Sequence, residues 1–238
     1  MFEFFDDIER EARLGEISQR LQLPLSSLSV LLHSLVKLGY LSHDPERKTF
    51  VPTLRIGMLG AWTGGSLAHH GWITRILEDL SEQTGETITV AARNGIYAQY
   101  IRVIQSSHAL RVHVPTGTYR LLVWSASGTA LLSNTEESEI EALVRRTNAE
   151  NPNMKKWIEL EQVLQNIEAF RRQGYFFSQE LVTTGGGHIA MRLPNTGIGS
   201  EGQIYALGVA GWIDRMQEKE ECIIGLMRET LRSRFEPQ

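Results

Sequence analysis

The chain of 238 residues has a single cysteine, Cys222, so it cannot form an internal disulfide. That usage fits a reducing compartment, and we expect a cytoplasmic protein. No apolar run approaches the roughly 20 residues that a transmembrane helix needs, and the acidic start MFEFFDDIERE lacks the basic region of a secretory signal. The sequence therefore predicts neither a membrane span nor a disulfide-stabilised scaffold.

An excess of positive charge is also missing. Lys and Arg number 24 against 28 Asp and Glu, which gives a net charge of −4 and argues against a uniformly basic, nucleic-acid-coating protein. Locally the balance differs, because residues 10–60 carry seven basic and four acidic side chains, a net of +3. This modest positive field permits DNA binding by the N-terminal region without requiring it.

Motifs for metal binding or catalysis are absent as well. The seven histidines and one cysteine show no spacing of a known metal site, and the stretch SASGT is not a nucleophile elbow. Gly197-x-Gly199-x-x-Gly202 matches a dinucleotide fingerprint only as text, since it follows Pro-Asn rather than a strand. The sequence therefore predicts no catalytic residue, no metal, no cofactor and no enzyme.

The first sixty residues follow the order helix, helix, hairpin. Residues 3–12 are amphipathic, and GEISQRLQL predicts a helix that Pro24 ends. We expect Ser26 to cap the next helix and Gly39 to end it. Its inward stripe is predicted to be Leu28, Leu31, Leu32 and Leu35. Since YLSHDPERKTFVPT predicts strand, turn and strand, the pattern is typical of a winged helix-turn-helix.

The helix that would enter DNA has no Lys or Arg between Leu25 and Val36. Its predicted outward face and the wing supply the candidate DNA contacts, which are Ser26, Ser27, Ser29, Val30, His33, Arg47 and Lys48. Serine bonds to several bases and valine touches a thymine methyl, but neither makes the bidentate guanine contact of arginine. We therefore expect weak half-sites that favour A·T, while a winged helix used only for protein contacts stays open.

The Gly64-Gly65 pair interrupts helical continuity and predicts a domain boundary. Beyond it, WITRILEDLSEQTG predicts a helix. The runs TITVAARNG, IYAQYIRVIQ and ALRVHVPTG predict three strands, with Asn94-Gly95 as a hairpin turn. Two helical segments, two strand-like runs and a helix from about residue 217 to 235 complete the chain. A mixed sheet flanked by helices is an α+β domain.

Six stretches, in this order, resemble the IclR family of bacterial transcription regulators over nearly the whole chain. They are EISQRLQLPLSSLSVLLHSLVKLGYL, FVPTLRIGMLG, ILEDLSEQTGETITVAARNG, ASGTALLS, IEAFRRQGY and GQIYALGVAGWIDR. The resemblance implies a winged helix-turn-helix at 1–57, a linker helix at 58–66 and a GAF-like α/β effector-binding domain at 67–238. It also implies a homodimer or tetramer, palindromic operator DNA and a small organic acid as effector.

The same resemblance implies an effector site, formed by Ala126, Ser127, Gly128, Thr129, Ser178, Gln179, His188, Gly208 and Ala210. Gly208 and Ala210 stand where the family has serines, and Val30 stands where it usually has arginine. The smaller residues predict a roomier, less polar cavity, which favours aromatic acids, with Trp124 and Trp212 near enough in sequence to stack on a ring. His188 is the best candidate to meet a carboxylate.

Two functions remain open at this point. The first is a ligand-responsive DNA-binding transcriptional regulator, in which the effector shifts a conformational equilibrium by its differential affinity. The second is a ligand-sensing regulatory protein that has lost DNA binding and acts through protein–protein contacts, which the missing arginine at Val30 motivates. Salt-dependent DNA binding would separate the two.

Overall fold

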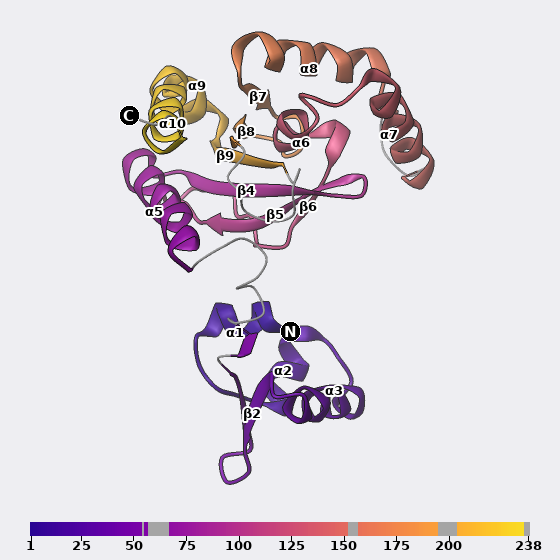
Figure 1. Cartoon of the computed structure of the whole chain (residues 1–238), viewed down its shortest axis with the longest axis vertical. Helices are drawn as coiled ribbons and strands as arrows, with labels where there is room; N and C mark the ends of the chain where they lie inside the picture. The colour runs from indigo at the N-terminus through magenta and orange to yellow at the C-terminus, as the bar shows by residue number, and fades with distance from the viewer. Residues whose placement is uncertain (54, 57–66, 152–156, 195–203, 236–238) are drawn as a thin grey trace. The chain divides into compact units, whose positions relative to one another are not determined.

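The computed structural model describes residues 1–53, 55–56, 67–151, 157–194 and 204–235 (Figure 1). The chain divides into two compact units, Met1–Leu67 and Ala68–Gln238. The predicted linker helix at 58–66 and the glycines of the dinucleotide-like motif lie outside the described residues. Within the described part of the chain, no helix is both long and apolar enough to cross a membrane.

The first unit is a winged helix-turn-helix, as the sequence predicts. Its elements are α1 (Phe2–Ile8), β1 (Ala12–Arg13), α2 (Leu14–Leu21), α3 (Leu25–Lys37), β2 (Leu41–Asp44) and β3 (Thr49–Pro52). β2 and β3 form the wing hairpin, and β1, which the sequence did not predict, pairs with β3 to give an antiparallel sheet of order β1-β3-β2. The short strand β1 is therefore an edge strand of this sheet.

Two expectations for α3 are wrong in detail. Leu28 and Leu32 are buried in the core of the first unit, but Leu31 is 44% exposed. The buried face instead continues through the half-buried Leu35 and Val36, so Leu31 falls on its flank. Ser26 is not the N-cap, because the helix begins at Leu25 and no side chain caps it. Gly39 ends the helix in the left-handed region, with φ of 78°, as expected.

The second unit is a six-stranded antiparallel sheet with helices on both faces (Figure 1). Its elements in chain order are α5 (Leu67–Thr84), β4 (Thr87–Asn94), β5 (Tyr97–Ile104), β6 (Tyr119–Leu121), η1 (Leu122–Trp124), α6 (Ala126–Leu131), α7 (Glu137–Glu150), α8 (Leu160–Gln173), β7 (Phe176–Gln179), β8 (Gly186–Arg192), β9 (Tyr205–Trp212), α9 (Ile213–Glu218) and α10 (Glu220–Phe235). The strand order is β6-β5-β4-β9-β8-β7.

Successive side chains of the central strands point to opposite faces of the sheet, so the second unit has two hydrophobic cores. Ile88 and Val90 of β4 pack with α5, α9 and α10 on one face, whereas Ala91 packs with α6, α7 and α8 on the other. Consecutive residues of a strand therefore pack into different cores, one on each face of the sheet. This alternation leaves Thr87 and Thr89, which are buried and polar, on the face covered by α6.

The strand expected in ALRVHVPTG is wrong, because residues 105–118 form a loop between β5 and β6. Between Leu110 and Val114 its backbone bonds to side chains, whereas Gly117 and Thr118 bond to the backbone of Tyr100 on β5. The Gln105 amide bonds the backbone of Val114 in both directions, and Arg215 donates to the Leu110 carbonyl. The hairpin predicted at Asn94-Gly95 exists, but Asn94 pairs with Tyr97, so the two loop residues are Gly95 and Ile96.

Candidate effector and DNA-binding sites

Four neighbouring strands bring polar side chains together on the α6 face of the sheet. Ser178 of β7 lies opposite His188 of β8, and His188 lies opposite Ala210 of β9. One step further across the sheet, Thr89 of β4 lies opposite Gly208. Directly opposite residues point to the same face of an antiparallel pair, so Ser178, His188 and Thr89 all lie on the α6 face, with the small residues Ala210 and Gly208 between them. We call these polar side chains the polar row.

The imidazole of His188 lies at the centre of this row. Its Nε2 is 3.3 Å from Thr89 Oγ1, and its Nδ1 is 3.5 Å from the Tyr100 hydroxyl. Burial, helped by the nearby Arg120 guanidinium, lowers the pKa of His188 from its ordinary 6.5 to about 4. The imidazole is therefore neutral at neutral pH, and it can bind a carboxylate by hydrogen bonding but not by charge.

Gly208 supplies the space that His188 fills. A Cβ placed on Gly208 would lie 2.1 Å from His188 Nε2 and 2.6 Å from Thr89 Oγ1. The expectation that Gly208 makes the ligand cavity larger is therefore wrong, because the imidazole occupies the room left by the missing side chain. The argument for an aromatic acid therefore loses the part of its basis that rests on Gly208, although Ala210 does line the cavity described next.

A small cavity of about 40 Å³ opens beside this row. Its described lining consists of Tyr100, Val112, Val114, Arg120, Ser178, Val182, Thr183, Gly186, Gly187, His188 and Ala210. Arg120 is the only charged residue in that lining, and no carboxylate of the described chain pairs with it. The cavity therefore combines one cation with a neutral imidazole and hydroxyl groups, which suits a small anion.

Tyr100 and Ser127 extend the polar row beneath Arg120. Burial raises the pKa of the Tyr100 phenol, and Arg120 and the Ser127 hydroxyl oppose that rise only in part. Ser127 lies in α6 and is fully buried, and its Oγ makes no well-aligned hydrogen bond within the described part of the chain. A buried hydroxyl of this kind gains from a polar neighbour, so we count Ser127 with the site.

Of the predicted effector residues, Ser178, His188 and Ala210 belong to the described lining of the cavity, and Ser127 and Gly208 lie outside it. Ala126, Gly128 and Thr129 are buried in α6, where the Gly128 amide and the Thr129 hydroxyl both bond to Ser125. Gln179 points away from the row and its amide accepts from Gln217 at 2.9 Å. Trp124 and Trp212, the expected aromatic walls, are not part of the described lining either. Trp124 donates to the Leu181 carbonyl, and Trp212 packs against Gly185.

A buried ion pair anchors the loop that carries Val112 and Val114. Glu86 is fully buried and accepts two hydrogen bonds from Arg215 of α9, at 2.7 and 3.0 Å. Arg215 also donates to the Leu110 carbonyl at 3.1 Å, and hydrogen bonding to Glu86 raises the pKa of its guanidinium. One side chain thus connects β4, α9 and the cavity wall.

Sequence reasoning did not identify Thr89, Tyr100 and Arg120. The sequence offered one signal for Thr89. Thr87 and Thr89 are two residues apart in the largely apolar stretch TITVAA, so both point to the same face of the strand and make that face polar. Tyr100 and Arg120 gave no such sign. They come from strands that the sequence separates by a loop of irregular backbone, and only the pairing of β5 with β6 brings them together.

We expect Gly208→Ser to lower the free energy of unfolding of the second unit by about 1–3 kcal/mol, because the new side chain meets His188 in a filled space. The double variant Gly208→Ser with His188→Ser should recover most of that loss. Urea denaturation of both proteins checks this. Equal destabilisation of the single and double variants would show that His188 does not fill the space over Gly208.

The candidate DNA-binding surface lies on α3. Ser26, Ser27, His33 and Lys37 are exposed, Ser29 is half-buried, and Val30 is 69% exposed. Leu31 adds apolar surface to the same helix. The structure therefore places most of the predicted contacts at the surface.

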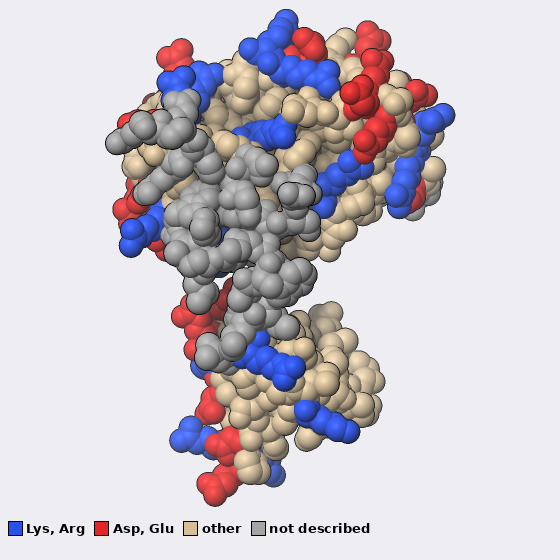
Figure 2. Space-filling view, in the orientation of Figure 1, with Lys and Arg blue, Asp and Glu red and all other residues tan. Residues whose placement is uncertain are grey.

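The wing is less basic than its sequence suggests. Arg47 lies 3.1 Å from Glu11 and 3.9 Å from Asp44, whose carboxylate also accepts the backbone N–H groups of Glu46 and Arg47. In the face shown in Figure 2, blue and red side chains stand side by side around the hairpin of the first unit. Within the described part of the chain Lys48 forms no ion pair, so it is the less compensated of the two wing cations.

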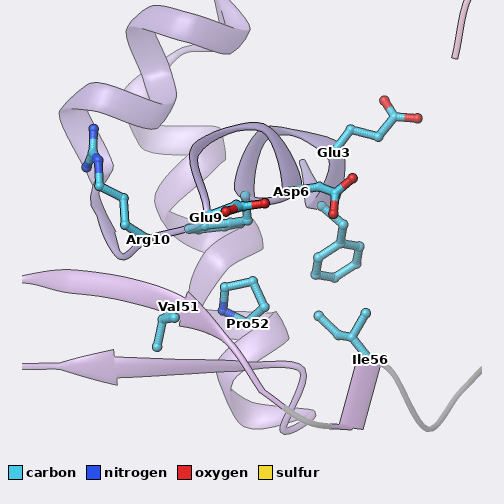
Figure 3. Close-up of a pocket in the computed structure, with 9 residues that line it drawn as sticks. Glu3, Asp6, Glu9, Arg10, Val51, Pro52 and Ile56 are labelled. Atoms are coloured by element: carbon cyan, nitrogen blue, oxygen red, sulfur yellow. The ribbon is translucent and has the colours of Figure 1, made fainter. Parts of the chain in front are cut away.

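A second hollow of about 560 Å³ lies in the first unit, between α1 and the end of β3 (Figure 3). Val51, Pro52 and Ile56 form its apolar side, and Glu3 and Asp6 of α1 stand around it together with Glu9, which follows that helix. Arg10 also lines the hollow, but its guanidinium is paired with Glu16. Three carboxylates repel phosphate and organic anions. The α1 side of this unit is therefore suited neither to DNA nor to an acidic effector.

Comparison with protein families and known structures identifies a known domain in each of the two units. The family model of the IclR helix-turn-helix domain matches residues 1–45, and that of the bacterial transcriptional regulator IclR C-terminal domain matches residues 71–233. A repressor, AllR from Salmonella typhimurium, is 28% identical over 222 residues, which cover 91% of this chain and 79% of AllR. The regulator KdgR from Dickeya chrysanthemi is 26% identical over 167 residues, and the chain covers 55% of its length.

Solved structures give the same result. The IclR effector domain from Acinetobacter sp. ADP1 is 31% identical with a TM-score of 0.66, and the match covers 72% of this chain and 98% of that domain. IclR from Thermotoga maritima shares the fold alone, with 17% identity and a TM-score of 0.65 over 94% of this chain and 89% of that one. With two family models that together match most of its length, the chain belongs to the IclR family of bacterial transcriptional regulators.

Proposed function

We propose that this protein is a transcriptional regulator that binds operator DNA through α3 and the β2–β3 wing and responds to a small carboxylic acid. The observation that carries the effector half is the cavity on the α6 face, where Arg120 is the single charge of the described lining. Family membership supports the DNA-binding half. The effector acts by binding one conformation more tightly than another.

The effector class follows from the chemistry and size of the cavity. Arg120 offers a charge-assisted contact to a carboxylate, and neutral His188 with the Ser178 hydroxyl offers further hydrogen bonds. A volume of about 40 Å³ is far below the several hundred Å³ typical of sites for larger ligands. An acid of a few carbon atoms therefore suits the site better than an aromatic one.

The protein is proposed to bind DNA as a homo-oligomer. Ser26, Ser27 and Val30 present hydroxyls and an apolar surface but no guanidinium, so one half-site gains little discrimination. Two symmetric copies bound to a palindrome add their contributions. The opposing possibility, a regulator that acts through protein contacts only, is favoured by one observation, namely that Glu11 and Asp44 neutralise Arg47.

We expect Arg120→Gln to weaken binding of the acid effector by about tenfold to one hundredfold, the range for a lost charge-assisted hydrogen bond. Calorimetry with glyoxylate, pyruvate and benzoate provides the measurement, and the small acids should bind more tightly than benzoate. Arg102→Gln is the matched control, because Arg102 is exposed on β5 and does not line the cavity. Unchanged affinity in Arg120→Gln, or a preference for benzoate, would contradict the proposed effector class.

We expect Lys48→Ala to lower the salt slope of DNA binding by about one, because each neutralised phosphate releases a counterion. Arg47→Ala should change the slope less, since Glu11 and Asp44 already pair with that side chain. Mobility shifts on the DNA flanking the gene, over a series of salt concentrations, give both slopes. Absence of any salt-dependent binding would favour the regulator that acts through protein contacts.

A further inference from the structure

His33 differs from the other outward residues of α3 because its ring is held from two sides. It is exposed and lies one turn after Val30. Its ring centroid is 5.6 Å from that of His43 on β2 and 5.7 Å from that of Phe50 on β3. His43 in turn stacks on Phe50 at 4.6 Å, and Phe50 is part of the buried core. The wing therefore fixes where the imidazole points.

The hydrogen-bonding character of this imidazole is also fixed. His33 Nδ1 lies 2.8 Å from the backbone carbonyl oxygen of Ser29. A carbonyl oxygen only accepts, so Nδ1 carries the hydrogen. The other nitrogen, Nε2, is then an acceptor in the neutral ring and a donor in the protonated ring.

The side chains near His33 on α3 differ from it in their hydrogen-bonding roles. The hydroxyls of Ser26 and Ser27 rotate and can donate or accept. The Ser34 hydroxyl already donates to the Val30 carbonyl at 2.8 Å, and the Val30 side chain is apolar. Of the polar side chains exposed on this part of α3, His33 alone offers an atom that accepts in the neutral form and donates in the protonated form.

We propose that His33 is the residue of α3 that discriminates between bases, and that its protonation changes which base it selects. Neutral Nε2 accepts from the exocyclic amino group of adenine or cytosine, whereas protonated Nε2–H donates to the N7 or O6 acceptors of guanine. This inference rests on the proposed DNA-binding function.

The charged and titratable groups around the ring come from two elements. His43 faces it from β2, with Asp44 next in sequence, and Lys37 lies one turn further along α3. β3 contributes Phe50, which carries no charge. His43 is therefore the second histidine beside this ring in the described part of the chain, and the experiment has to separate the two.

The test is selection of binding sites by the full chain from a randomised duplex library, at about pH 8 and about pH 6, where imidazole changes its charge. The parent should enrich adenine or cytosine at one position of each half-site at the higher pH and shift toward guanine at the lower. His33→Ala should lose about threefold to tenfold of the preference at that position, the value of one hydrogen bond. His33→Gln should keep a preference that does not change with pH.

His43→Phe is the matched control, because it keeps an aromatic ring on Phe50 and removes the second titrating group. The pH-dependent shift should persist in this variant. If His33→Ala selects the same sequences as the parent, or if His43→Phe abolishes the shift, the inference is wrong while DNA binding stands. If the parent enriches no sequence at either pH, the inference and the proposed DNA-binding function are both wrong.

Discussion

We expect Arg215→Met to lower the free energy of unfolding of the second unit by about 3–5 kcal/mol, the cost of leaving a buried charge without its partner. Glu86 is fully buried, and Arg215 supplies hydrogen bonds to both of its carboxylate oxygens. His108 lies 3.6 Å from the same carboxylate, too far for a hydrogen bond, so it does not replace the guanidinium. Urea denaturation followed by circular dichroism measures the change.

The double variant Glu86→Gln with Arg215→Met should be more stable than Arg215→Met alone, because it removes the buried charge together with its partner. Arg228→Met is the matched control, since Arg228 is exposed and only covers the Tyr175 ring and one backbone carbonyl. A loss in Arg228→Met as large as in Arg215→Met would contradict the argument. So would a double variant no more stable than the single one.

The same substitution should also act on the effector cavity. Arg215 donates to the Leu110 carbonyl, and the loop that this bond anchors supplies Val112 and Val114 to the cavity lining. Releasing the loop allows it to fluctuate, so an acid effector has to order it again on binding. Weaker effector binding in Arg215→Met is therefore expected even at a urea concentration and temperature where the unit stays folded.

We expect His188 to make the second unit acid-sensitive by about 3 kcal/mol between pH 6.5 and pH 4. The folded-state pKa is lowered to about 4 from the ordinary 6.5, mainly by burial. In that window the unfolded chain binds a proton and the folded chain does not. Stability is therefore complete above pH 6.5 and falls as the pH is lowered toward 4.

The comparison with His188→Gln isolates this effect from the other groups that titrate in acid. The parent should lose more stability than the variant between these pH values, and the two should run parallel above pH 6.5. His113→Gln is the matched control, because His113 is exposed on the loop before β6 and should leave the pH dependence unchanged. A parent and a His188→Gln variant with the same acid dependence would show that His188 is not buried as a neutral group.

Local sequence signals were sufficient to predict those helices, strands and turns whose conformation depends on residues close together in the chain. Gly39 predicted the end of α3 because only a left-handed residue terminates the helix there, and its φ is 78°. Strand-like runs of apolar residues predicted β4, β8 and β9. Such signals failed in residues 105–118, because the middle of the strand-like run ALRVHVPTG has side-chain partners, and only at its end does Gly117 bond to β5.

The sequence by itself determined the winged helix-turn-helix, the α+β second domain, and a recognition helix that presents serines and His33 in place of arginine. Only the tertiary structure decided what these residues can do. From the sequence, Gly208 is expected to leave room for a ligand, but the neighbouring strand β8 places the His188 side chain in that space. From the sequence, His188 could also bind a carboxylate by charge, but burial lowers its pKa to about 4. The reason is physical: cavity volume, desolvation and charge pairing depend on residues brought together from distant parts of the chain.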